Sequence, residues 1–128
     1  MGLVEAHPPL LRLHAAEASC VPRVATGMGA GMARHGEVCG ALLGAAMGLS
    51  LRYGRENASE NEAKEALYSK VDQLLSAFEA EFGSVRCIDL TGCDMRTPEG
   101  RARVTELDLH HKCCPKFVAF AARFAEST

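Results

Sequence analysis

The stretch SENEAKEALYSKVDQLLSAFEAEF, residues 59–82, decides the fold class. Its apolar residues recur at spacings of three and four, which predicts an amphipathic helix. These residues are Ala63, Leu67, Val71, Leu74, Leu75, Phe78 and Phe82. Ser59 and Glu62 have the spacing of a capping box, in which two side chains satisfy free backbone N–H groups at a helix start. Gly83 follows and can adopt the left-handed conformation that ends a helix.

Further helices are predicted on both sides of this one. Residues 37–53 are apolar nearly all round, which indicates a buried helix. Residues 115–125 begin with a proline, which is favoured in a first turn, and repeat apolar residues at helical spacing. Shorter helices are predicted over residues 10–18 and 99–109. Because no stretch alternates polar and apolar residues, we expect an all-α fold, a compact bundle of about four to five helices.

The predicted helix at residues 37–53 carries Gly40, Gly44 and Gly48 on one face. A glycine costs a helix about 1 kcal/mol relative to alanine, so a stripe of three suggests that another backbone packs closely there. We therefore expect this to be the buried, glycine-striped central helix. The preceding residues 21–36 are broken by glycines that match no phosphate-binding motif, and they predict a turn-rich loop.

Size and charge narrow the function. The chain has 128 residues, which predicts a single helical domain over residues 1–128, and its formal net charge is -2. Lys and Arg are not clustered, which argues against nucleic acid as a partner. The longest apolar run, residues 38–51, is shorter than the roughly 20 residues that cross a bilayer, and the N-terminus lacks a signal-peptide pattern. We expect a cytoplasmic protein with no membrane partner, for which a homodimer is one permitted assembly.

Six cysteines are many for a chain expected in a reducing compartment, which favours metal binding or redox chemistry over structural disulfides. Cys39 falls in the first turn of the predicted buried helix, and Cys114 directly precedes Pro115. The positive end of a helix dipole stabilises thiolates at such positions. Cys87 and Cys93 flank the segment CIDLTGC, which we interpret as a loop without the close spacing of a zinc ribbon.

The other cysteines and the nearby histidines give weaker signals. Cys113 adjoins Cys114, and the side chains of adjacent residues usually diverge. Cys20 has no partner in the sequence and is best explained as a buried, inert thiol. Imidazoles could complete a metal site or lower a thiol pKa, although solvated histidines are more common. The histidines near cysteines are His35, His110 and His111.

Three stretches together resemble one family. The run VATGMGAGMARHGEVCGALLGAAMGLSLRYG, followed by RCIDLTGCDM and KCCPKFV, is similar to the C_GCAxxG_C_C family of redox-active proteins, over about residues 21–124. The resemblance implies redox or metal chemistry at Cys39, Cys87 and Cys114. Cys93 lies beside a motif position, and Cys113 is an alternative to Cys114.

Two functions are therefore expected in order of preference. The first is a thiol–disulfide or electron-transfer oxidoreductase whose redox thiols are Cys39, Cys87 and Cys114, with a partner protein or small-molecule reductant that no motif identifies. The alternative is a metal-binding protein that holds zinc or an iron–sulfur cluster, since sulfur ligands suit both. Its ligands would come from Cys39, Cys87, Cys93, Cys113 and Cys114. A helical scaffold with incidental cysteines is a third possibility.

Overall fold

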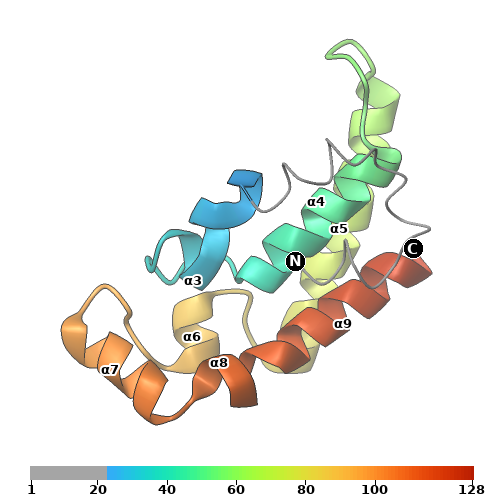
Figure 1. The fold of residues 1–128 in the computed structure, drawn as a ribbon. Helices are drawn as coiled ribbons and strands as arrows, with labels where there is room; N and C mark the ends of the chain where they lie inside the picture. The colour runs from blue at the N-terminus through green and yellow to red at the C-terminus, as the bar shows by residue number, and fades with distance from the viewer. Residues whose placement is uncertain (1–22) are drawn as a thin grey trace.

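A computed structural model describes residues 23–128, and within that range the chain forms helices and no strand (Figure 1). The all-α prediction is therefore confirmed for this part of the chain. The predicted helix at residues 10–18 and Cys20 lie outside it. The elements are η2 Thr26–Met28, α3 Gly29–Met32, α4 Gly40–Tyr53, α5 Asn61–Phe82, α6 Cys87–Thr91, α7 Pro98–Glu106, α8 Leu109–Lys112 and α9 Cys114–Ser127.

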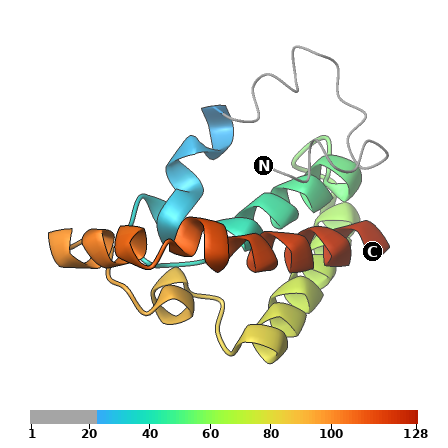
Figure 2. The same ribbon diagram turned by 60° about the horizontal axis from the view of Figure 1, so that its bottom comes forward.

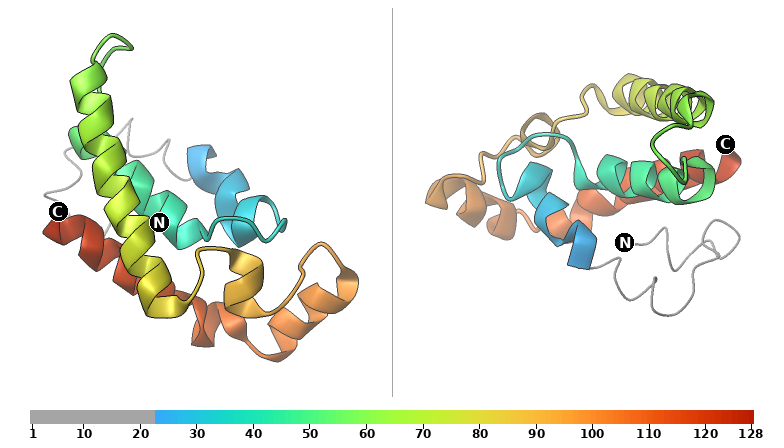
Figure 3. Two further views of the ribbon diagram at one scale, coloured as in Figure 1. Left: turned by 180° about the vertical axis from the view of Figure 1, so that it is seen from behind. Right: turned by 90° about the horizontal axis from the view of Figure 1, so that it is seen from above.

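Three long helices form the main core. Helices α4 and α9 lie side by side and run in the same direction, and α5 packs against both (Figures 1 and 3). At the C-terminal ends of the parallel pair, the Tyr53 hydroxyl donates a 3.2 Å hydrogen bond to the carbonyl of Thr128. The buried residues of this first cluster are Cys39, Leu42, Ala45, Leu49, Leu74, Phe78, Phe117, Ala121 and Ala125.

A second, smaller cluster lies beside the N-terminal end of α9, where α6, α7 and α8 gather (Figure 2). Its buried residues are Cys87, Cys93, Met95 and Val104. Short helices cannot bury much apolar surface on their own, so this region depends on contacts between them. The two clusters are joined by backbone hydrogen bonds between residues 36–39 and 85–88, around an isolated antiparallel bridge from Val38 to Arg86.

The helix starts differ from those predicted. Helix α4 begins at Gly40, three residues later than predicted, because Val38 is paired with Arg86 instead of being helical. Helix α5 begins at Asn61, and the predicted capping box is wrong. The Ser59 hydroxyl instead hydrogen-bonds the side chain of Asn57, and no side chain caps the helix.

The helix ends follow the sequence more closely. Gly83 ends α5 in the left-handed conformation (φ 87°), as predicted, and its N–H donates to Glu79. The single helix predicted over residues 99–109 is divided into α7 and α8 because Asp108 is left-handed (φ 53°). The Thr97 hydroxyl caps α7 by accepting a 3.0 Å hydrogen bond from the N–H of Gly100.

The predicted loops contain helical turns. Residues 87–91 form α6, and the glycine-rich segment contains η2 and α3 in place of an irregular loop. Residues 30–34 all have positive φ, which makes this turn locally left-handed. In α4, Gly44 and Gly48 are buried, but a Cβ on Gly40 would meet Met28 O at 3.5 Å, an ordinary contact. The close backbone approach predicted for the glycine stripe is therefore not required at Gly40.

No helix between residues 23 and 128 is both long enough and apolar enough to span a bilayer.

Candidate functional site

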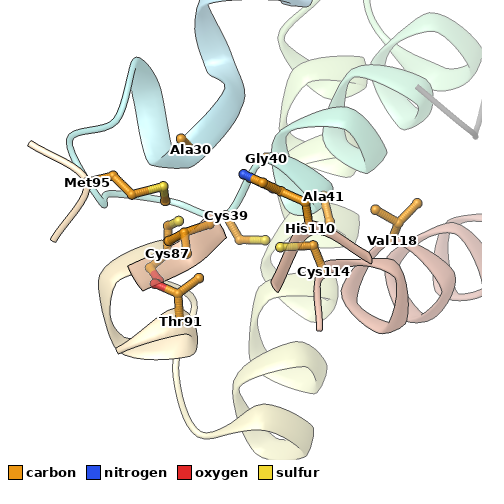
Figure 4. Close-up of a pocket in the computed structure, with 11 residues that line it drawn as sticks. Ala30, Cys39, Gly40, Ala41, Cys87, Thr91, Met95, His110, Cys114 and Val118 are labelled. Carbon is orange, nitrogen blue, oxygen red and sulfur yellow. The ribbon is translucent and has the colours of Figure 1, made fainter. Parts of the chain in front are cut away.

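A pocket of about 170 Å³ lies where the two apolar clusters meet (Figure 4). Three cysteines line it, each from the N-terminus of a different helix. Cys39 is the N-cap of α4, Cys87 is the first residue of α6, and Cys114 is the first residue of α9. The pocket therefore contains the three thiols for which the sequence predicts redox chemistry.

The parallel packing of α4 and α9 brings Cys39 and Cys114 together. Because the two helices run side by side in the same direction, their N-termini lie at the same end of the core. The two side chains point toward one another (Figure 4). Cys39 is only 8% exposed, whereas Cys114 is partly accessible. This arrangement places a protected thiol opposite a more accessible one.

Backbone pairing between the two clusters places Cys87 beside this pair. The Cys39 N–H donates to Val85 O at 2.8 Å, and the Cys87 N–H donates to Glu37 O at 2.7 Å. The Cys87 side chain lies near Met95 (Figure 4). Gly31 is also close, because an added Cβ there would lie 2.8 Å from the Cβ of Cys87. Cys87 is thus held on several sides by closely packed atoms.

The other predicted cysteines lie around the pocket without lining it. Cys93 is buried in the second cluster, with its Sγ 3.5 Å from Thr91 O. Cys113 is the N-cap of α9 and packs against the first cluster. Among residues 23–128, no three His, Cys, Asp or Glu side chains are grouped so that they could hold one metal ion.

Among the histidines of residues 23–128, only one lines the pocket. His110 is solvent-exposed and forms part of the rim, together with Val118, which is 42% exposed. His111 points elsewhere and pairs with Asp108 at 2.7 Å. His35 is exposed and interacts electrostatically with Asp94. The exposure of His35 and His111 agrees with the expectation that most of these imidazoles are solvated.

The pocket thiols are harder to ionise than the helix-dipole argument predicted. Burial raises the pKa of Cys39, and the smaller opposing effect of hydrogen bonds with the backbone of Ala41 and Leu42 does not reverse it. Burial, followed by repulsion from Cys113 and Cys39, raises the pKa of Cys114. Burial also raises the pKa of Cys87 to about 11, with a smaller electrostatic contribution from Cys39, Cys114 and Cys93. Desolvation thus outweighs the helix N-termini, and the thiols are protonated at neutral pH.

We expect the reduced protein to lose stability at alkaline pH. The pKa of Cys87 is higher in the folded state than in the unfolded state, so the folded protein binds more protons as the unfolded thiol ionises. The contribution of the Cys87 thiol to the free energy of unfolding is therefore intact below about pH 8.5. It falls by about 2–3 kcal/mol as the pH rises toward the pKa of the folded state. Urea unfolding of the reduced protein across this pH range measures the loss.

The Cys87→Ala variant should show a shallower decline with pH. Cys93→Ala is the control, because it truncates another buried thiol of the same cluster and corrects for lost packing. An identical alkaline slope in the wild-type and Cys87→Ala proteins would contradict this explanation. Cys39 and Cys114 account for the part of the slope that persists in Cys87→Ala.

Met95 is a pocket residue that sequence reasoning missed. It is 5% exposed and packs in the second cluster beside Cys87. The residue lies between helices in the segment after Cys93, where no periodicity indicates which side chains turn inward. Its thioether is apolar and polarisable, so it closes the pocket wall without adding a charge.

Comparison with known proteins adds one finding to this geometry. A family model described as "Putative redox-active protein (C_GCAxxG_C_C)" matches residues 11–128, nearly the whole chain. The chain belongs to this family. The C_GCAxxG_C_C name has Gly-Cys-Ala where this chain has Cys39-Gly40-Ala41, so the cysteine here lies one residue earlier, at the N-cap of α4. No curated protein and no solved structure matches the chain.

Proposed function

We propose that this protein is a thiol–disulfide oxidoreductase in which Cys39 and Cys114 cycle between two thiols and one disulfide. The observation that carries the proposal is that these side chains face each other in one pocket, from the N-termini of two parallel helices. Membership of a family described as redox-active supports the same chemistry.

The two cysteines have different roles in this proposal. Cys114 is the more accessible thiol and lies one helical turn before Val118, on the exposed rim. It is therefore the attacking nucleophile. Its thiolate forms a bond to one sulfur of a substrate disulfide and releases the other sulfur as a thiol. The thiolate of Cys39 then attacks Cys114 Sγ, which forms the internal disulfide and releases the second substrate thiol.

Cys87 is the least acidic thiol of the pocket, with a pKa raised to about 11. In this proposal it lines the pocket and takes no part in thiol–disulfide exchange. A thiol of such high pKa supplies little thiolate at neutral pH, and the thiolate is the reactive form. Cys87 should thus stay reduced while the Cys39–Cys114 pair is oxidised.

Oxidation with diamide tests the pairing directly. Diamide takes up two electrons and two protons, so one disulfide forms for each molecule consumed. We expect the wild-type protein to lose two free thiols, and peptide mass spectrometry to find a peptide that links Cys39 with Cys114. Cys93→Ser is the control, since Cys93 is buried but does not line the pocket. It should form the same link.

Single variants separate the two roles. With a reactive disulfide reagent, Cys39→Ser should accumulate a stable mixed disulfide on Cys114, because no resolving thiol faces it. Cys114→Ser should react more slowly, since Cys39 is buried. Two outcomes would overturn the proposal: a disulfide that joins other cysteines in the wild-type protein, or undiminished loss of two thiols in Cys114→Ser.

A further inference from the structure

The pocket is small enough to limit what can reach the two facing thiols. Its volume is about 170 Å³. An apolar cavity of about 150 Å³ is large enough to take up a molecule the size of benzene, whereas most pockets for drug-sized ligands start at about 300 Å³. A peptide segment or a tripeptide thiol is too large to fit inside. One half of a small disulfide is the right size.

Most of the described pocket wall is apolar, and the imidazole of His110 lies at its solvent-exposed rim. Among the described residues, no Asp, Glu, Lys or Arg lines the pocket. Within the described part of the wall, the only hydroxyl belongs to Thr91, and it already donates a 2.9 Å hydrogen bond to Cys87 O. Much of the remaining wall is apolar, including Met95, Val104 and Val118. A charged substrate would lose its hydration against this wall without gaining an ion pair with a carboxylate, lysine or arginine side chain.

We infer that the oxidant of this site is an uncharged, low-molecular-weight disulfide. The inference rests on the proposed Cys39–Cys114 couple and adds its substrate class. The neutral disulfide RSSR enters past His110 and Val118 and meets Cys114 first. Attack by Cys114 breaks the S–S bond and releases one RSH, and attack by Cys39 on the mixed disulfide releases the second RSH. One RSSR is thus reduced to two RSH as two protein thiols become one disulfide, and the thiol protons leave with the products.

Three probes of similar size and different charge test the inference. They are hydroxyethyl disulfide, which is neutral, cystamine, which carries two positive charges, and dithiodiglycolate, which carries two negative charges. Rates of Cys39–Cys114 disulfide formation are measured at an ionic strength of about 0.15 M, where long-range electrostatics are screened. Each rate is divided by that of the same probe with 2-mercaptoethanol, which removes differences in intrinsic reactivity. Both charged probes should react at least about 10-fold more slowly than the neutral probe.

A variant at the rim adds a second readout. Val118→Glu places a carboxylate at the opening, and since Val118 is 42% exposed the fold should tolerate the change. The neutral probe should react more slowly with this variant, and the disadvantage of cystamine should shrink. Val24→Glu is the matched control, because Val24 is 60% exposed and does not line the pocket. It should leave all three relative rates unchanged.

The outcomes distinguish this inference from the proposed function. Equal normalised rates for the three probes would overturn the substrate class and leave the redox couple standing. Slowing of only one charged probe would also overturn it, because that result points to attraction or repulsion by surface charge and not to desolvation. Failure of every oxidant, diamide included, to join Cys39 with Cys114 would overturn the redox couple itself and the inference with it.

Discussion

Replacing Phe78 with alanine is expected to lower the free energy of unfolding by about 3–5 kcal/mol. The Phe78 side chain is fully buried at the contact of the three long helices. The centroid of its ring lies 4.8 Å from that of Phe82 and 5.7 Å from that of Phe117. Truncation removes these contacts and leaves a cavity that the surrounding helices cannot close. Urea unfolding monitored by circular dichroism measures the change.

Tyr68→Ala is the matched control for this prediction. Tyr68 is on the same helix but is 61% exposed, and the Lys64 ammonium lies 5.8 Å from the centroid of its ring. Its truncation should cost less than about 1 kcal/mol. Similar losses for the two variants would show that burial of Phe78 in the aromatic cluster is not the source of the effect.

The second large effect is expected at Gly31. Its φ of 67° is unfavourable for any residue with a Cβ, and an added Cβ would lie 2.5 Å from Glu37 N and 2.8 Å from Cys87 Cβ. Gly31→Ala combines backbone strain with overpacking, each typically 1–3 kcal/mol, so we expect a loss of about 3 kcal/mol or more. Because the clash includes Cys87, alkylation of that thiol by a neutral maleimide should also become faster.

Gly29→Ala is the matched control, because it adds the same methyl group at a nearby glycine that is not closely packed. Gly29 lies two residues earlier in the same segment, has a φ of -67°, and has nothing within 4 Å of the position that an added methyl group would occupy. This substitution should change the free energy of unfolding by less than about 1 kcal/mol and leave Cys87 alkylation unchanged. If Gly29→Ala and Gly31→Ala were equally destabilised, close packing at Gly31 would not be the cause.

The parts of the fold that depend on local sequence could be predicted. Helices α5 and α9 follow apolar spacing, and Gly83 ends α5 through its own backbone freedom. The start of α5 was predicted wrongly because Ser59 has a competing partner in Asn57. The sequence allows both the capping box and the hydrogen bond to Asn57, and only the three-dimensional geometry decides between them.

The parts that depend on distant contacts could not be predicted. Helix α6 is only five residues long, too short to be stable alone, and is fixed by backbone bonds to residues 36 and 37. The left-handed turn at residues 30–34 includes four residues other than glycine, for which this conformation is unfavourable in isolation. Both features exist because the tertiary structure imposes them.

The sequence pointed to the cysteines that line the pocket, but not to the pKa of their thiols. Placement at helix starts pointed to Cys39 and Cys114, the family resemblance added Cys87, and these three line one pocket. The predicted stabilisation of the Cys39 and Cys114 thiolates was wrong, because the depth of burial is a property of the packed structure. The same limitation hid Met95, whose inward orientation is set by its neighbours.

The parallel arrangement of α4 and α9 has a consequence for how the chain folds. Cys39 and Cys114 are far apart along the chain, whereas Cys87 is close to Cys93. In an unfolded chain, the entropy of loop closure favours encounters between near neighbours. An oxidant that reaches the nascent chain too early would therefore trap mismatched sulfurs. In the proposed couple, the pairing of Cys39 with Cys114 would become favoured only after the helices have docked, so that disulfide would be a product of completed folding and not a guide to it.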